Sequence, residues 1–135
     1  MKGSYLLLIK LNEDRNIKYG IRKNILFKKG NYVYVGSALN NLEKRIQRHL
    51  RSNKKKHWNI DFFLEYGDII NVYYKENDYR EECYIADLLK DIYLPISNFG
   101  SSDCKCKTHL FYISKYKLKN FLRKNKMKEY LIQKT

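Results

Sequence analysis

Residues 31–36, NYVYVG, and residues 39–50, LNNLEKRIQRHL, decide the fold that we predict for this chain. The first stretch alternates aromatic and β-branched side chains and ends at a glycine, which is typical of a β-strand. The second repeats apolar residues at three- and four-residue steps, which indicates an amphipathic helix. We therefore expect a strand that leads directly into a helix.

The side of this helix opposite its apolar stripe is polar; its members are Asn41, Arg45, Arg48, His49 and Ser52. Because Tyr34 stands near the end of the preceding strand, we expect it to face this polar stripe. Two interpretations are open at this point. The stripe is either an ordinary solvated helix face or one wall of a phosphate-binding cleft.

The size of the chain predicts one domain, residues 1–135, that buries a core without disulfide bonds. Hydrophobic residues make up 44% of the sequence, and no run approaches the roughly 20 apolar residues of a membrane span. The first residues lack the layout of a secretory signal, so we expect an intracellular, cytoplasmic protein. The three cysteines are then thiols or metal ligands.

A net charge of +14 predicts a polyanionic partner, nucleic acid in preference to a membrane surface. Residues 42–57 hold seven basic side chains and one acidic one, and residues 115–135 hold eight and one. Residues 61–91 reverse this balance, with nine acidic and three basic side chains. An acidic segment in a basic protein repels phosphate unless a cation is held there, so a metal site is expected in this segment.

The hydrophobic patterns predict a single α+β unit, a small antiparallel central sheet flanked by helices. We expect a first meander of about three strands, built from residues 5–11, one or two short strands within 17–27, and 31–36. A further strand is expected at 69–74 and another at 109–113. The expected helices are 40–52, 57–64, 80–93 and a basic C-terminal helix at about 115–126.

Several pieces of the sequence resemble the GIY-YIG nuclease superfamily. Gly3-Ser4-Tyr5 and Tyr34-Val35-Gly36 resemble the two halves of its signature, and residues 42–45, LEKR, resemble the helix that carries its arginine. Residues 57–61 (HWNID), Glu82-Cys83 and residues 102–111 (SDCKCKTHLF) are similar to a group of small archaeal-type stand-alone GIY-YIG-like proteins of poorly defined function. The resemblance covers residues 3–112 in the same order. Ser4 and Ser37 depart from it, and Ser37 stands where many family nucleases carry a lysine.

This resemblance implies hydrolysis of a phosphodiester, which needs a base for the nucleophile and positive charge on the phosphoryl oxygens. Tyr34 would be the base and Tyr5 a positioning or alternative base, because nearby positive charge favours a phenolate. Arg45 would clamp the phosphate with its planar fork. His49, titrating near neutrality, would hold the water or donate a proton.

The resemblance places one divalent ion, Mg²⁺ or Mn²⁺, on Glu82 at the start of the second long helix. Asp87 is the alternative ligand, and Glu81 and Asp61 are further candidates. Expected contacts to the substrate backbone come from Gly36, Ser37, Arg48, Lys54, Lys55, Lys56 and Asn98. No base-reading helix is evident, so binding is expected through the phosphates, with DNA favoured over RNA.

Cys83, Cys104, Cys106 and His109 offer a second metal site, a structural zinc. The Cys-x-Cys-x-x-His spacing is tighter than that of the usual knuckle, so buried thiols and a hydrogen-bonded histidine are the competing interpretation. A cysteine nucleophile paired with His109 is a further alternative. The sequence thus predicts a monomeric, metal-dependent endonuclease acting in DNA repair or processing, with a catalytically inactive nucleic-acid-binding module or a zinc-stabilised interaction protein as rivals.

Overall fold

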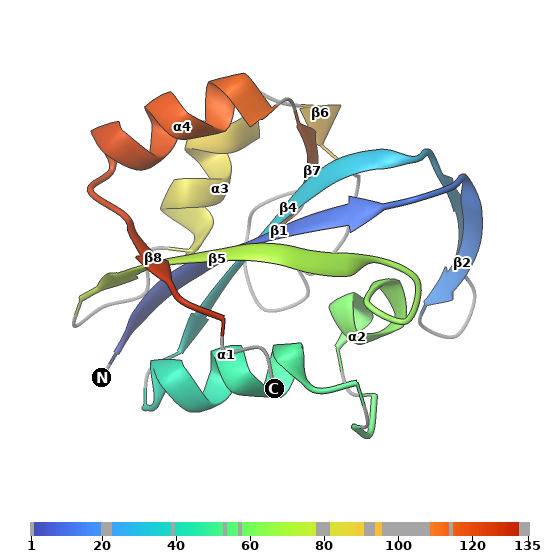
Figure 1. Cartoon of the computed structure of the whole chain (residues 1–135), viewed down its shortest axis with the longest axis horizontal. Helices are drawn as coiled ribbons and strands as arrows, with labels where there is room; N and C mark the ends of the chain where they lie inside the picture. Colours follow the sequence, from blue (N-terminus) through green and yellow to red (C-terminus); the bar gives the residue numbers. More distant parts are fainter. Residues whose placement is uncertain are drawn as a thin grey trace.

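A computed structural model describes residues 2–19, 23–38, 40–52, 54–56, 58–77, 82–90, 94–95, 109–113 and 115–132. The strands are β1 (Gly3–Leu11), β2 (Arg15–Tyr19), β3 (Lys23–Phe27), β4 (Gly30–Ala38), β5 (Asp68–Glu76), β6 (Leu94–Pro95), β7 (Leu110–Ile113) and β8 (Lys128–Tyr130). The helices are α1 (Leu42–Leu50), α2 (Asn59–Phe63), α3 (Glu82–Lys90) and α4 (Lys115–Lys124). Figure 1 shows their arrangement.

The main sheet has six strands in the order β6-β7-β4-β1-β5-β8, and its neighbouring strands are antiparallel. This confirms the predicted α+β class with a central antiparallel sheet flanked by helices. β1 lies between β4 and β5 in the middle of this order. A central strand needs apolar side chains on both faces, which explains the nearly continuous apolar run in β1.

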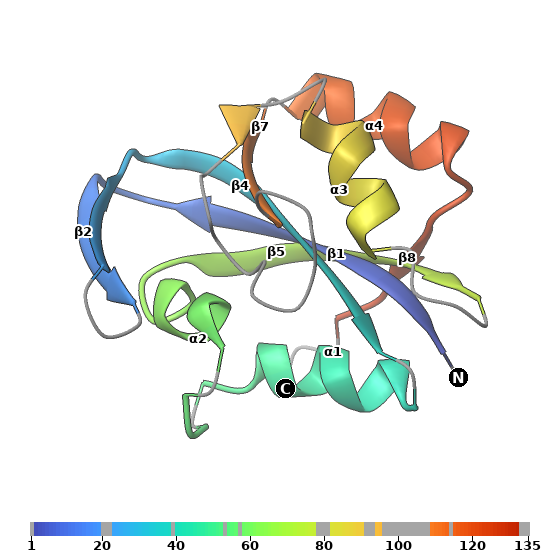
Figure 2. The same ribbon diagram turned by 180° about the vertical axis from the view of Figure 1, so that it is seen from behind.

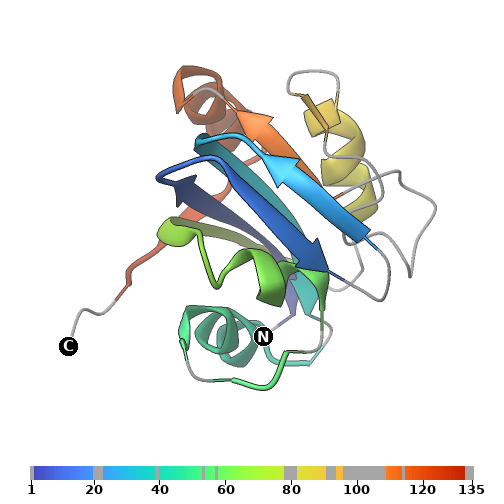
Figure 3. The same ribbon diagram turned by 90° about the vertical axis from the view of Figure 1, so that its right-hand side faces the viewer.

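Each face of the sheet has its own core. Tyr5, Leu7 and Tyr34 pack on one face with side chains of α1 and α2. Leu6, Leu8, Val33 and Val35 pack on the other with side chains of α3 and α4. Figures 1 and 3 show α1 and α2 below the strands and α3 and α4 above them, and Figure 2 shows α3 and α4 side by side.

The predicted three-stranded meander is wrong, because β2 and β3 pair with each other in a separate two-stranded sheet. They continue the β1–β4 hairpin beyond a bend. The pairing runs from Leu11 opposite Gly30 to Arg15 opposite Phe27, so three residues on one side face two on the other. One extra residue bends a strand pair in the way that a β-bulge does. The bend carries Ile17 and Phe27 into the core beside α2.

The C-terminal part matches the expected helix and adds a strand that the sequence did not predict. α4 ends at Lys124, and β8 then pairs with the middle of β5. β8 has only three residues and alternates poorly, so its sequence alone carries no strand pattern. Among the residues that the structure describes, every helix is too short or too polar to cross a membrane.

Candidate functional site

Tyr5 and Tyr34 lie on the same face of the sheet, on neighbouring strands. Tyr5 stands opposite Gly36 in the β1–β4 pairing, and Leu7 stands opposite Tyr34. A Cβ atom at Gly36 would overlap the ring of Tyr5, and one at Gly3 would overlap the backbone carbonyl of Lys75. The glycines of both triplets are therefore required by close packing. Gly36 lets the Tyr5 ring cross β4 and reach α1.

The Tyr5 ring ends at a buried hydrogen bond. Its Oη lies 2.7 Å from Nε2 of His49, and the two residues are 1% and 3% exposed. Burial lowers the pKa of His49 to about 3, so its imidazole is neutral near physiological pH. The expected titration near neutrality is wrong because His49 is buried in the core. Its Nδ1 accepts or donates no hydrogen bond within the described part of the chain.

Tyr34 borders this pair, and Arg45 is joined to it through the ring of Trp58. The Tyr34 ring is 8% exposed and meets the His49 ring edge-on, with 6.1 Å between centroids. Arg45 is partly exposed and donates from Nη1 to the backbone oxygen of Ser37 at 3.2 Å. Its guanidinium stacks on Trp58, 4.5 Å from the ring centroid. In the described part of the chain no carboxylate pairs with Arg45, which leaves it donors for a ligand.

Arg48, predicted to bind substrate, is engaged inside the protein. Its Nη1 and Nη2 donate to the two carboxylate oxygens of Asp61 at 3.0 and 2.9 Å, and Nη2 also donates to the Lys55 carbonyl. The Asp61 side chain is fully buried and accepts a further hydrogen bond from the Trp58 backbone. Asp61 was a further candidate metal ligand. Its geometry here is that of a buried ion pair that also caps α2.

The lysines after α1 differ among themselves. Lys54 donates to the carbonyls of His49 and Arg51 at the C-terminal end of α1, where a cation is favoured. Lys56 pairs with Glu65. Of the three predicted phosphate contacts, Lys55 is exposed and forms no ion pair with a described residue.

α3, which carries the predicted metal ligand Glu82, packs on the face opposite Tyr5 and Tyr34 through Ile85, Ala86 and Leu89. The structure therefore brings Tyr5, Tyr34, Arg45 and His49 together but does not bring α3 to their face of the sheet. The described residues contain no group of three or more acidic, histidine or cysteine side chains that could hold a metal ion. They do not fit a metal centre beside Tyr34.

Other predicted site residues lie partly or wholly outside the described region. This applies to Asn98, Cys104 and Cys106, and to the side chains of Glu82, Cys83 and Asp87. His109 is described and 3% exposed, and its carbonyl accepts from the Val35 backbone. Burial of His109 agrees with the interpretation as a satisfied core histidine, and the zinc site stays a prediction.

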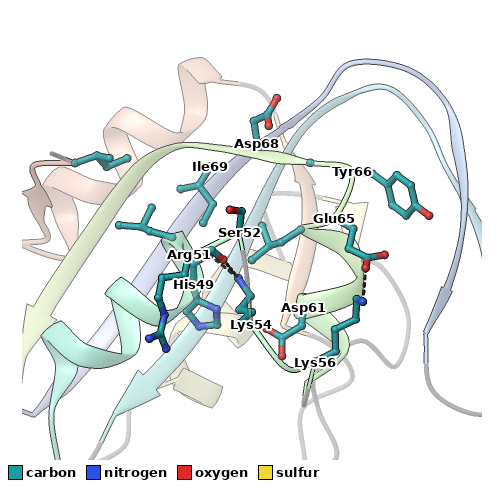
Figure 4. A pocket seen from close by; sticks show the side chains of 14 residues that line it. His49, Arg51, Ser52, Lys54, Lys56, Asp61, Glu65, Tyr66, Asp68 and Ile69 are labelled. Carbon is teal, nitrogen blue, oxygen red and sulfur yellow. Dashed lines mark hydrogen bonds and ion pairs between the residues drawn. The ribbon is translucent and has the colours of Figure 1, made fainter. Parts of the chain in front are cut away.

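A pocket of about 720 Å³ lies at the end of α1, between α2 and the start of β5 (Figure 4). Lys54, Asp61 and Glu65 contribute polar side chains to its wall, and Ile69 and Ile132 contribute apolar ones. His49 also lines it, whereas Tyr5, Tyr34 and Arg45 are not part of the lining. The pocket and the tyrosine cluster thus share His49.

Trp58 is the residue of the site whose role the sequence left unassigned. Its ring stacks on both Arg45 and Arg48 and lies 6.0 Å from the His49 ring, between centroids. It also precedes α2 as the N-cap, with Asp61 at the third helical position. An acidic residue three positions after a helix cap is a recognisable signal, and it identifies Asp61 as a structural residue.

A family model describes the same region of the chain as one unit. The model is a domain of unknown function, DUF123, and it matches residues 4–131. No curated protein and no solved structure matches the sequence. The match includes every strand and helix described above apart from the first residue of β1. The chain therefore belongs to the DUF123 family.

Proposed function

We propose that the protein is a GIY-YIG-like endonuclease that hydrolyses phosphodiester bonds in DNA. The observation that carries the proposal is the meeting of Tyr5, Tyr34 and His49 on one face of the sheet, with Arg45 joined to them through the Trp58 ring. The two tyrosines, the histidine and the arginine are the residues that the resemblance assigns to catalysis. The net charge of +14 supports a polyanionic substrate.

The arrangement divides the roles by exposure. Arg45 is accessible and would bind two oxygens of the scissile phosphate with its planar fork. Tyr34 is the tyrosine nearer to solvent and, as a phenolate, would accept a proton from the attacking water. Tyr5 and His49 are buried, so they position the Tyr34 ring without touching the substrate.

A divalent metal ion remains part of the proposal, as the charge that would neutralise the phosphate and polarise the water. No described residue is assigned to it, and we derive no step through it. Glu82 stays the predicted ligand.

Nicking of supercoiled plasmid, with Mg²⁺, with Mn²⁺ and with EDTA, tests the proposal. Tyr34→Phe and Arg45→Ala are each expected to slow nicking about 100-fold or more. Tyr66→Phe is the matched control, because Tyr66 is exposed and stacks on Arg15 away from the cluster. If Tyr34→Phe and Arg45→Ala nick as fast as the control, the assigned site is wrong. If Glu82→Ala does so, the metal assignment is wrong.

A second candidate function is a nucleic-acid-binding module without turnover. It is favoured by the burial of Tyr5 and His49 and by the position of α3 on the opposite face. Salt-dependent binding without nicking in either metal, on plasmid, flapped and branched DNA, would support this candidate over the first.

A further inference from the structure

The surface formed by α4 and the turn that follows it, here called the α4 surface, is basic. Its exposed cations are Lys119, Arg123, Lys124 and Lys126. No ion pair joins any of them to a described residue. The acid in this part of the chain, Glu129, accepts a hydrogen bond from Asn71. The α4 surface therefore presents four positive charges to solvent, without an ion pair to any residue that the structure describes.

The α4 surface lies on the opposite side of the molecule from the candidate site. Leu118 and Phe121 attach α4 to the sheet face that carries Leu6 and Val33, whereas Leu42 attaches α1 to the face that carries Tyr5. Figures 1 and 3 show the sheet between the two helices. α1 and the loop after it also present exposed cations, Lys44, Arg51 and Lys55, that form no ion pair with a described residue. The molecule thus has two basic surfaces that face apart.

The separation of these surfaces decides what they can bind. A helix is about 10 Å across and packed layers lie about 10 Å apart, so the outer sides of α1 and α4 are about 30 Å apart. A straight duplex that lies against one surface cannot reach the other. Simultaneous use of both surfaces requires two nucleic-acid segments.

We infer that the α4 surface binds the backbone phosphates of a second DNA duplex, so that one molecule holds two duplex segments at once. The inference rests on the proposed function for the first segment, which lies against α1. Nucleic acid fits better than an anionic membrane, because the described apolar side chains of α4, Leu118, Phe121 and Leu122, pack on the core and are not presented to a bilayer. Contacts of this kind are made to phosphates and carry no sequence preference.

The test uses the full chain in EDTA, so that no cleavage is needed. Two short duplexes, one labelled with an energy donor and one with an acceptor, are mixed with the protein, and energy transfer reports that both are held together. Sedimentation in the same buffer establishes whether the protein is a monomer. The α4 variant is Lys119→Gln, Arg123→Gln and Lys124→Gln. Its control is Lys18→Gln, Lys28→Gln and Lys29→Gln, which removes three exposed charges from the β2–β3 region.

Wild type and control are expected to show transfer from a monomer that binds two duplexes. The α4 variant should still bind one duplex, and its energy transfer should fall about tenfold or more. The slope of the logarithm of the binding constant for the second duplex against the logarithm of the salt concentration should become smaller in magnitude by about 3. Equal transfer by variant and control would overturn the inference, as would one duplex per wild-type monomer. If the wild-type protein binds anionic vesicles, if the α4 variant does not, and if no duplex binds to the α4 surface, the partner of this surface is a membrane and the inference is overturned.

Failure of this inference can be told apart from failure of the proposed function. A protein that holds two duplexes in EDTA but never nicks plasmid contradicts the endonuclease proposal alone. A protein that nicks plasmid, with Tyr34→Phe inactive, but holds one duplex contradicts the α4 inference alone.

Discussion

Arg45 and Arg48 stand on adjacent turns of α1 and both stack on Trp58, yet their surroundings differ. Arg48 is 19% exposed in its side chain and is held by both oxygens of the buried Asp61. Arg45 donates to the backbone carbonyl of Ser37, and no carboxylate among the described residues pairs with it. The same residue type on the same helix thus stabilises the fold at one position and can bind an anion at the other. The partner decides the role.

Removing the Asp61 carboxylate should destabilise the surroundings of Arg48 more strongly than the other changes destabilise the protein. Asp61→Ala leaves a largely buried guanidinium without its counter-charge and removes the acceptor that caps α2. We expect the free energy of unfolding to fall by about 3–5 kcal/mol, measured by chemical denaturation. Glu65→Ala is the control, because its pair with Lys56 is exposed and contributes about 1 kcal/mol or less. Equal losses in the two variants would contradict a structural role for the Arg48–Asp61 pair.

A methyl group at Gly36 should disturb the packing of Tyr5 and His49 next to Arg45. In Gly36→Ala the new Cβ overlaps the buried Tyr5 ring, so the ring must move away from His49. A cost of about 1–3 kcal/mol in unfolding free energy is expected. Tyr5→Leu removes the ring, so Gly36→Ala should cost much less in that background. If the cost is unchanged there, the overlap is not its cause.

The buried imidazole should make stability depend on pH. The pKa of His49 is about 3 in the folded protein, below its unfolded value near 6.5, so the unfolded state binds more protons between these values. Stability should therefore fall as pH falls through this window, by about 1 kcal/mol between pH 7 and about 5.5 from His49 alone. Comparing denaturation of wild type and His49→Gln at each pH isolates this share, since His57 and His109 are common to both. Parallel curves would show that His49 titrates normally.

Truncating Arg45 should change stability least. Arg45→Ala loses one hydrogen bond to Ser37 and the stacking on Trp58, which together contribute about 1 kcal/mol or less at a partly exposed site. Arg48→Ala should cost several-fold more in the same denaturation experiment. A loss for Arg45→Ala as large as that for Arg48→Ala would end the distinction between the two arginines. Slower nicking without lost stability would sharpen it.

The sequence predicted those parts of the fold that depend on local pattern. β1, β4, β5 and the long helices carry clear periodicities, and their positions agree with the prediction to within a few residues. The bend between β1 and β2 was missed because one extra residue in a turn leaves the hydrophobic pattern unchanged. The sequence also could not predict which face of the sheet α3 covers. Both faces of β1 are apolar, so neither face is marked for a particular helix.

Within the site, the convergence of Tyr5, Tyr34, Arg45 and His49 follows the order of the motifs. Their environments do not, because burial and pairing depend on residues far away in the chain. His49 belongs to a polar stripe in sequence, and its contacts with Tyr5, Tyr34 and Trp58 show that it lies in the core. The end of α1 and the basic loop lie between Arg48 and Asp61 in the chain, so their pairing has no local signature. Such pairs distinguish an arginine held inside the protein from one that a ligand could reach.

Trp58 has a practical consequence for experiments on this protein. It is the single tryptophan of the chain, and its ring contacts both arginines and lies beside His49. Its fluorescence therefore reports on the space between the Arg48–Asp61 pair and Arg45. An anion that docks on Arg45 is expected to change the emission of the folded protein, whereas unfolding exposes the indole to water. One intrinsic optical signal can thus follow ligand docking and loss of the fold without any added label.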